Sequence, residues 1–325
     1  FKKEDYYEMK KSKLKNYTLT GSIHTVAVKS QGAIEDVQKE VGDCITASVH
    51  PGRKGSDVST TSIVNPNKLF GDLYSFDECC TAVQTILAGA GIDDYQVIRA
   101  DMRFDSPDLD HYREFQKLNR YLISALAVAY KVKNAYCSVN LFSQKQLSVA
   151  VKNKYFEIEN YDKAAESHGK DPAASRLEIR SKCFNDQDLR KEFLERWPKR
   201  LDKAIKHLEE VQGAYNDALE DLYREGLGAD EVRFRSMTDF LLQYQDCIFC
   251  KRQLIEFLSR FPDQIKNPVS YAENFKKRYK IEYFSESDVR YAVQEITRAA
   301  GEFFGAEERP EGVRNELFEE KPEVA

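Results

Sequence analysis

The stretch "YFEIENYDKAAESHGKDPAASRLEIRSK", residues 155–182, contains two short segments in which apolar and charged residues alternate. In the first, residues 156–159, the order is Phe, Glu, Ile, Glu, and in the second, residues 176–180, it is Arg, Leu, Glu, Ile, Arg. Successive side chains of a β-strand point to opposite faces of its sheet. Each segment therefore predicts a strand with one apolar face and one charged face, and Tyr161 and Lys163 continue the charged face of the first.

The segment "YQVIRADMRFD", residues 95–105, shows the same division, with Ala100, Met102 and Phe104 on one face. We expect the three strands to pair in one sheet, with the apolar face packed against a helix predicted over residues 109–132. The charged positions of this third strand are Arg99, Asp101, Arg103 and Asp105.

The remaining N-terminal patterns predict an α+β fold, a mostly antiparallel sheet with helices packed on one face. A helix is expected over residues 75–91, with Ser75 as its N-terminal cap and glycines at its end. Lys-Asn-rich junctions between the later strands predict hairpin turns. The further predicted strands are residues 21–30, 44–51, 62–71 (ending in an Asn-Pro turn), 135–142 and 146–153.

The pattern after residue 186 predicts helices throughout. A long helix is expected to begin near Pro198, and shorter helices near 229–260, 268–280 and 286–304, the last capped by Ser285 or Ser287. The apolar stripe of the long helix is Leu201, Ile205, Leu208, Val211, Tyr215, Leu219 and Leu222. The expected divisions are a catalytic domain at 1–185, a helical domain for DNA binding or oligomerisation at 186–305, and a disordered charged tail at 306–325.

Composition places the chain among soluble globular proteins, with 42% hydrophobic and 32% charged residues in 325 residues. The longest apolar run, residues 122–130, is too short to cross a bilayer, and we see no signal peptide. Seven scattered cysteines favour a reducing cytoplasm, and Cys247 and Cys250 are expected in a helical core rather than at a metal site. The net charge of −5 permits a DNA partner without requiring one.

Two interpretations of the polar face remain open from the residues alone. Clustered carboxylates can hold a divalent cation that polarises a phosphodiester, with a nearby tyrosine attacking the phosphorus. Alternatively, the acidic and basic side chains form salt-bridged pairs across the strands of a solvated face. No His-hydrophobic-His pair is present, and each of the five histidines is expected at a surface or turn position rather than as a ligand.

The segment from Tyr155 to Lys182 resembles the active-site region of rolling-circle replication initiators of small Gram-positive plasmids, the replication-initiator/transposase-like family. Its "NYDKAAE" and "RLEIRSK" are similar to that family's Tyr-Asn/Asp-Lys, Glu and Arg-hydrophobic-Glu-hydrophobic-x-x-Lys motifs. The upstream "VIRADMRFD" and "NPNKLFG" also resemble segments of these proteins, so the likeness covers about residues 60–185. The strand before the tyrosine is acidic here, where the family usually carries Arg or Lys.

The resemblance implies a site-specific nickase that cleaves one DNA strand and stays attached through a 5′-phosphotyrosine. Tyr161 would be the nucleophile, with Lys163 and Arg176 orienting or neutralising phosphate. Acidic residues would hold Mg²⁺ or Mn²⁺. The implied metal ligands are Asp101 and Glu178, followed by Asp105 and Glu166.

The expected partner is origin DNA, together with a host helicase and a second copy of the chain in a homodimer, and no membrane. "NPVSYAENFKKRYK", residues 267–280, predicts a phosphate-contacting helix or an ordinary solvated one, and 285–301 is a weaker alternative. Competing functions are a conjugative relaxase using the same chemistry, a non-catalytic DNA-binding protein, and a helical scaffold. The expected DNA contacts are Lys152, Lys154, Arg180, Lys182, Lys276, Lys277 and Arg278.

Overall fold

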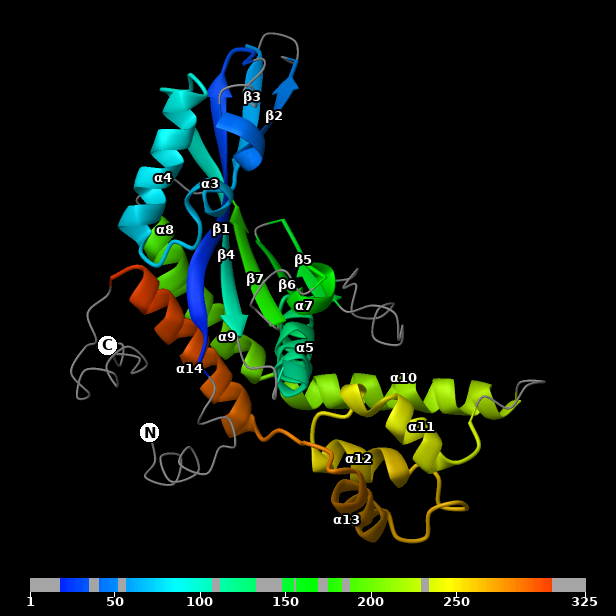
Figure 1. Cartoon of the computed structure of the whole chain (residues 1–325). Coiled ribbons are helices and arrows are strands. Elements are labelled where there is room, and N and C mark those ends of the chain that lie inside the picture. Colours follow the sequence, from blue (N-terminus) through cyan, green and yellow to red (C-terminus); the bar gives the residue numbers. More distant parts are fainter. Residues whose placement is uncertain are drawn as a thin grey trace, which may run out of the picture.

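The structure, a computed structural model, is an α+β fold built on a seven-stranded antiparallel sheet in the order β2-β3-β1-β4-β7-β6-β5 (Figure 1). It describes residues 18–34, 41–51, 57–106, 112–132, 148–154, 156–168, 175–182, 188–228 and 234–305. The strands are β1 (Thr20–Gln31), β2 (Ile45–His50), β3 (Ser59–Val64), β4 (Gln96–Ser106), β5 (Ser148–Lys152), β6 (Phe156–Asp162) and β7 (Ser175–Lys182).

A strand is present at each predicted segment within these ranges, and the pairing of the three charged strands is confirmed. The strand predicted at 62–71 has other bounds: it runs over Ser59–Val64, and residues 67–70 are helical. β4 pairs with β7 and β7 pairs with β6, so all three lie side by side. The Lys-Asn-rich junction between β5 and β6 forms a hairpin in which Asn153 and Phe156 are hydrogen-bonded. The strand predicted at 135–142 lies outside the described residues.

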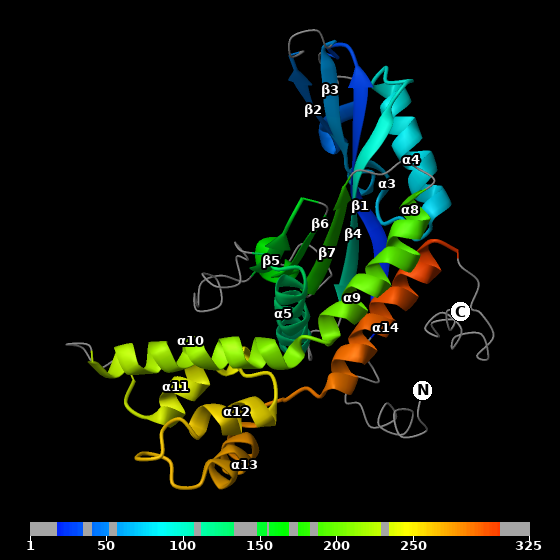
Figure 2. The ribbon, with the colours of Figure 1, turned by 180° about the vertical axis from the view of Figure 1, so that it is seen from behind.

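Helices cover the apolar face of the sheet, as the sequence predicts. Figure 2 shows α8, α9 and α14 running across this face, with α5 beside them. Only short helices, α3 and α7, lie at the opposite, polar face in the described part of the chain. The helices of this region are α3 (Asn67–Phe70), α4 (Phe76–Gly89), α5 (Tyr112–Ala129), α7 (Lys163–Glu166), α8 (Asp188–Lys191), α9 (Trp197–Ile205) and α14 (Glu286–Phe303), with a π-helical turn at Glu192–Arg196.

Both predicted capping residues take the expected geometry. Ser75 and Glu78 form a capping box at the start of α4, and Ser285 and Asp288 form one at the start of α14. In each box the serine accepts from a backbone amide of the first turn and the carboxylate accepts from the amide of the serine.

The prediction of one long helix from Pro198 is wrong. The helix is interrupted at Lys206 and His207, between α9 and α10, although the predicted apolar stripe is buried on both sides of the interruption. α9 packs on the sheet, whereas α10 turns away from it (Figure 1). The apolar period is the same on both helices because each buries one face, so the period alone does not reveal the change of direction.

The helices after the break form an arm that extends from the foot of the sheet, and the chain returns from it through α14 (Figures 1 and 2). α8, α9 and α14 belong to the layer on the sheet, so that layer continues past residue 185. The arm consists of α10 (Leu208–Gly228), α11 (Met237–Gln243), α12 (Lys251–Leu258) and α13 (Pro268–Tyr279), with a short 3-10 turn at Gln245–Cys247. A second 3-10 turn, Gly42–Cys44, precedes β2 in the sheet region.

Candidate active site on the polar face of the sheet

The register of β4, β7 and β6 sets charged side chains beside one another across the polar face, most of them opposite in sign. We define the polar face by the charged and tyrosine positions of these strands. Three rows run across it, each with its β7 residue in the centre. The rows are Asp101–Arg180–Glu157, Arg103–Glu178–Glu159 and Asp105–Arg176–Tyr161.

Tyr161 lies at the end of β6, just before Asp162 caps the short helix α7. Its hydroxyl donates a hydrogen bond of 3.2 Å to Oε2 of Glu178. Burial, followed by the charge of Glu178, raises the pKa of the Tyr161 phenol, against a lowering effect of Arg176. The phenol is therefore neutral at ordinary pH and is oriented by a carboxylate.

Glu178 is the acceptor that joins several of these side chains. It is 3% exposed, and Nε of Arg180 lies 2.9 Å from its Oε1. Nδ1 of His24 lies 3.4 Å from Oε2, the same oxygen that receives the Tyr161 hydroxyl. Burial alone would raise the pKa of Glu178, but His24 and Arg180 outweigh it and lower the pKa to about 2.

Arg180 lies among four carboxylates supplied by three strands. Its guanidinium nitrogens are 2.6 Å from Glu157, 2.9 Å from Glu178, 3.2 Å from Glu159 and 3.8 Å from Asp101. The side chain is 22% exposed, so the charge faces carboxylates more than solvent. This arrangement argues against a direct phosphate contact by Arg180.

Arg176 is also turned inward. It is 1% exposed and forms a bidentate pair with Asp105, at 2.6 and 2.8 Å. It is hydrogen-bonded to Tyr161 as well. Arg176 is thus placed to orient the tyrosine rather than to meet a phosphate from solvent.

The four expected metal ligands are only partly brought together. Asp101 and Glu178 share Arg180, and Asp101 is further bound by Arg99, with Nε at 2.7 Å. Asp105 lies four residues along β4 from Asp101, about 13 Å at the rise of a strand.

Glu166, the fourth expected ligand, lies away from this group on α7. It is 57% exposed and pairs with Lys163 across one turn of that helix. Lys163 also lies 5.8 Å from the centre of the Tyr161 ring, which places its ammonium beside the expected nucleophile.

The polar face, as arranged, does not fit a divalent cation. Within the described ranges no three His, Cys, Asp or Glu side chains are grouped so that they could hold a metal ion. The position between Asp101, Glu157, Glu159 and Glu178 is filled by the Arg180 guanidinium. A metal at this position would have to displace an arginine.

His24 is the residue of this site that sequence reasoning missed. The pairing of β1 with β4 shifts between Ile23 and Thr25, and His24 falls in that irregularity. A bulge re-aims a side chain, and here the imidazole lies against Glu178. No sequence signal reports the shift, because it depends on how β1 pairs with β4.

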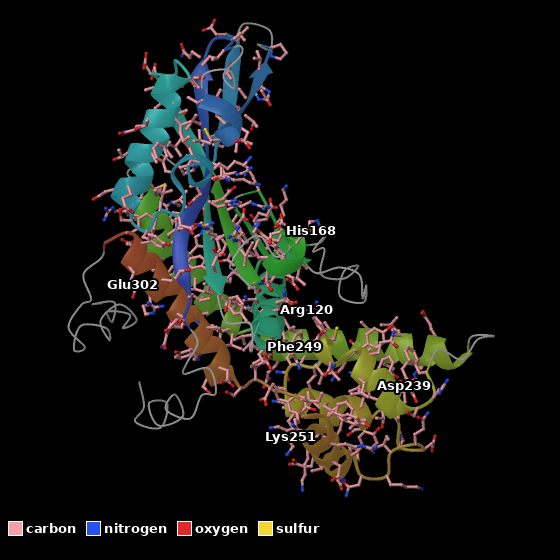
Figure 3. The ribbon with its side chains drawn as sticks, in the orientation of Figure 1. Arg120, His168, Asp239, Phe249, Lys251 and Glu302 are labelled. Atoms are coloured by element: carbon pink, nitrogen blue, oxygen red, sulfur yellow. The ribbon has the colours of Figure 1, made fainter. Side chains whose placement is uncertain are left out.

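The other described histidines occupy the expected surface or turn positions. His50 is exposed on the edge strand β2, and His207 lies in the turn between α9 and α10. His168, labelled in Figure 3, follows α7 with a positive φ of 54°. His111 lies outside the described residues.

The expected DNA contacts divide into two groups. On the sheet, Lys152 and Lys182 both approach Glu157, at 3.2 and 3.9 Å, and Lys154 is exposed at the β5–β6 turn. On the arm, the other three lie in the last turn of α13, where within the described ranges no carboxylate forms an ion pair with them. The three are Lys276, Lys277 and Arg278.

The cysteines at 247 and 250 contribute to the core and to a helix end. Cys247 is buried, and burial raises its pKa to about 11. Cys250 is the N-cap of α12, and its sulfur accepts from the amide of Gln253. Neither thiol has the low pKa of a reactive cysteine.

Comparisons of this chain with protein-family models, with curated proteins and with solved structures find no match. None of the helices in the described ranges combines the length and the apolar character that crossing a bilayer requires.

Proposed function

We propose that the chain is a DNA strand transferase that nicks and rejoins one strand through Tyr161 and thereby starts rolling-circle replication of a plasmid, phage or integrated element. The observation that carries the proposal is the hydrogen bond from Tyr161 to Glu178, made where three strands that resemble the initiator family lie side by side. Tyrosine is among the side chains that form covalent intermediates, and cations beside it would stabilise the charge that develops on the phosphate.

The proposed step is a transesterification. The Tyr161 oxygen bonds to phosphorus while the bond from phosphorus to the 3′ oxygen breaks, which yields a 5′-phosphotyrosine and a 3′-hydroxyl. The phenol loses one proton and the departing oxygen gains one, so the step conserves protons. The phosphotyrosine retains the bond energy for rejoining, and ATP is not needed.

Each neighbour of Tyr161 takes a distinct role in this proposal. Glu178 fixes the direction of the hydroxyl, and Arg176, bound to Asp105, is a positioning residue for the ring. Lys163, beside the tyrosine ring, is the cation assigned to the phosphate.

The arm would supply DNA affinity. The basic last turn of α13 is a better phosphate contact than the polar face, where the lysines and Arg180 already face carboxylates. The proposed setting is the cytoplasm, with origin DNA, a host helicase and a second copy of the chain as partners. A conjugative relaxase would use the same chemistry.

A second candidate function is a non-catalytic DNA-binding protein with the same fold. The observation that favours it is the pairing of opposite charges at four of the six cross-strand positions in these rows, which by itself stabilises a sheet. The two candidates differ in one measurable product, a covalent protein–DNA adduct.

The test is incubation of wild-type protein and Tyr161→Phe with single-stranded and hairpin DNA, with Mn²⁺ or with EDTA, followed by denaturing gels. We expect an adduct with the wild type and none with Tyr161→Phe. Tyr74→Phe is the matched control, because Tyr74 is 72% exposed and should keep full activity. An adduct that persists in Tyr161→Phe assigns the nucleophile to another tyrosine, and DNA binding without any adduct favours the non-catalytic function.

A further inference from the structure

Arg180 is the central charge of the polar face. It lies on β7, with Asp101 of β4 on one side and Glu157 of β6 on the other. Glu178 on its own strand and Glu159 on β6 complete the group of carboxylates around it. A planar guanidinium has five N–H donors, so one arginine can serve several carboxylates at once.

The carboxylates need this charge. Glu159 and Glu178 stand directly opposite each other on β6 and β7, and like charges in that position destabilise a sheet. Burial, with the charges of Glu178 and Glu157, raises the pKa of Glu159, which Arg180 opposes. Glu159 and Glu178 can stand opposite each other because the Arg180 guanidinium contacts both carboxylates.

The position of Arg180 is therefore that of a bound cation. It contacts the two residues that the family resemblance assigns first as metal ligands, Asp101 and Glu178. It also contacts Glu157 and Glu159 of β6, the strand that is acidic here where the family usually carries Arg or Lys. The added acids and the arginine among them form one electrostatic unit.

We infer that Arg180 is the resident cation of this site, supplied by the chain in place of a divalent metal, so that the native polar face neither needs nor binds one. Its meaning for catalysis rests on the proposed nicking function. The stability of the folded chain and its response to metal depend on Arg180 whether or not the chain nicks DNA.

The test is thermal unfolding of wild type, Arg180→Gln and Arg180→Lys, each in EDTA and in millimolar Mn²⁺ or Mg²⁺. We expect the wild-type Tm to be the same in all conditions. Arg180→Gln should unfold at a lower temperature in EDTA and recover by roughly 3–8 °C with Mn²⁺, because the freed carboxylates bind the ion. Arg180→Lys keeps a cation and should show no metal response.

Two controls make the result specific. Arg99→Gln breaks an arginine–carboxylate pair on the same face while leaving Arg180 in place, and should gain no response to metal. Adding Glu178→Gln to Arg180→Gln should abolish the gain. If Arg180→Gln does not fold, the wild-type response to Mn²⁺, read by unfolding and by electron paramagnetic resonance of the ion, still decides the question.

Three outcomes would overturn the inference: a wild-type Tm that rises with Mn²⁺ and loses this rise in Glu178→Gln, an Arg180→Gln variant with no metal response, or a Tyr161 adduct that forms only with metal. The expected metal responses without any adduct would support the inference while the nicking proposal fails.

Discussion

Lys117 places a charged side chain inside the core, where α5 meets the start of α14. Its Nζ donates to the carbonyl of Glu282 at 3.0 Å and lies over the rings of Tyr283 and Phe284. The titratable groups that face it are Asp246, Cys247, Glu282 and Glu114. Burial outweighs these acids and lowers the pKa of Lys117 to about 8.

Raising the pH should therefore favour the folded chain through Lys117. Between about pH 8 and the unfolded value of about 10.4, the unfolded chain holds a proton that the folded chain has released. This group alone should add stability with a slope of at most about 1.4 kcal/mol per pH unit.

The measurement is urea unfolding of wild type and Lys117→Met from pH 7 to 10. The free-energy difference between the two should shift in favour of the wild type above pH 8, whatever the cysteines and tyrosines contribute to both. Lys206→Met, at an exposed turn, should keep the wild-type slope. Parallel curves for wild type and Lys117→Met would contradict the assignment.

At the scale of one helix, α13 differs from the polar face in how its basic residues are used. Lys276 and Arg278 lie over the rings of Tyr283 and Tyr279, and Lys277 is exposed. On the same arm, Arg252 is engaged by Glu209 and Glu256. A basic side chain without a carboxylate partner can bind a phosphate and release a counterion from the DNA. A basic side chain already paired with a carboxylate gains less affinity from the same contact, because it must give up that pair.

If the chain binds DNA as we propose, changing the last turn of α13 should weaken that binding regardless of the DNA sequence. We expect the triple change of Lys276, Lys277 and Arg278 to Gln to reduce the slope of log affinity against log salt by roughly 0.7–0.9 for each phosphate that the helix no longer neutralises. Fluorescence anisotropy at several salt concentrations measures this slope. Arg252→Gln is the matched control, and an unchanged slope in the triple variant would place the DNA-binding surface elsewhere.

At the scale of the whole molecule, an aromatic junction joins the arm to the sheet region. Phe249 is fully buried and stacks on Tyr121 of α5 at 4.4 Å between ring centres, with Tyr215 of α10 packed on its edge at 4.7 Å. Figure 3 labels Phe249 and Arg120 at this junction, where Arg120 reaches the sulfur of Cys247. One continuous hydrophobic core runs through both regions.

Removing this ring should destabilise the chain strongly. We expect Phe249→Ala to lower the free energy of unfolding by about 3–5 kcal/mol, because it leaves a cavity between α5 and the arm. Denaturant unfolding measures the change, and Val269→Ala, at a position 52% exposed, should change it by less than about 0.5 kcal/mol. A decrease below about 1 kcal/mol for Phe249→Ala would mean that other side chains hold the arm.

Much of the candidate site was predictable from local patterns. The alternation in 95–105 and 156–180 assigns Asp101, Tyr161 and Glu178 to one face, and the helical stripes assign the other face to the core. The cap at Ser75 is equally local. The interruption of the predicted helix after residue 205 could not be predicted from the apolar pattern, because it follows from the different surfaces on which α9 and α10 pack.

Which side chains share a face follows from the sequence alone, because the strand period of two and the helix period of 3.6 are properties of neighbouring residues. The register between the strands, in contrast, is a property of the folded sheet. A shift of one residue between β7 and its neighbours would have turned Arg180 away from the acids. The position of Arg180 among four carboxylates, and of His24 beside Glu178, comes from the pairing of strands that lie far apart in the chain.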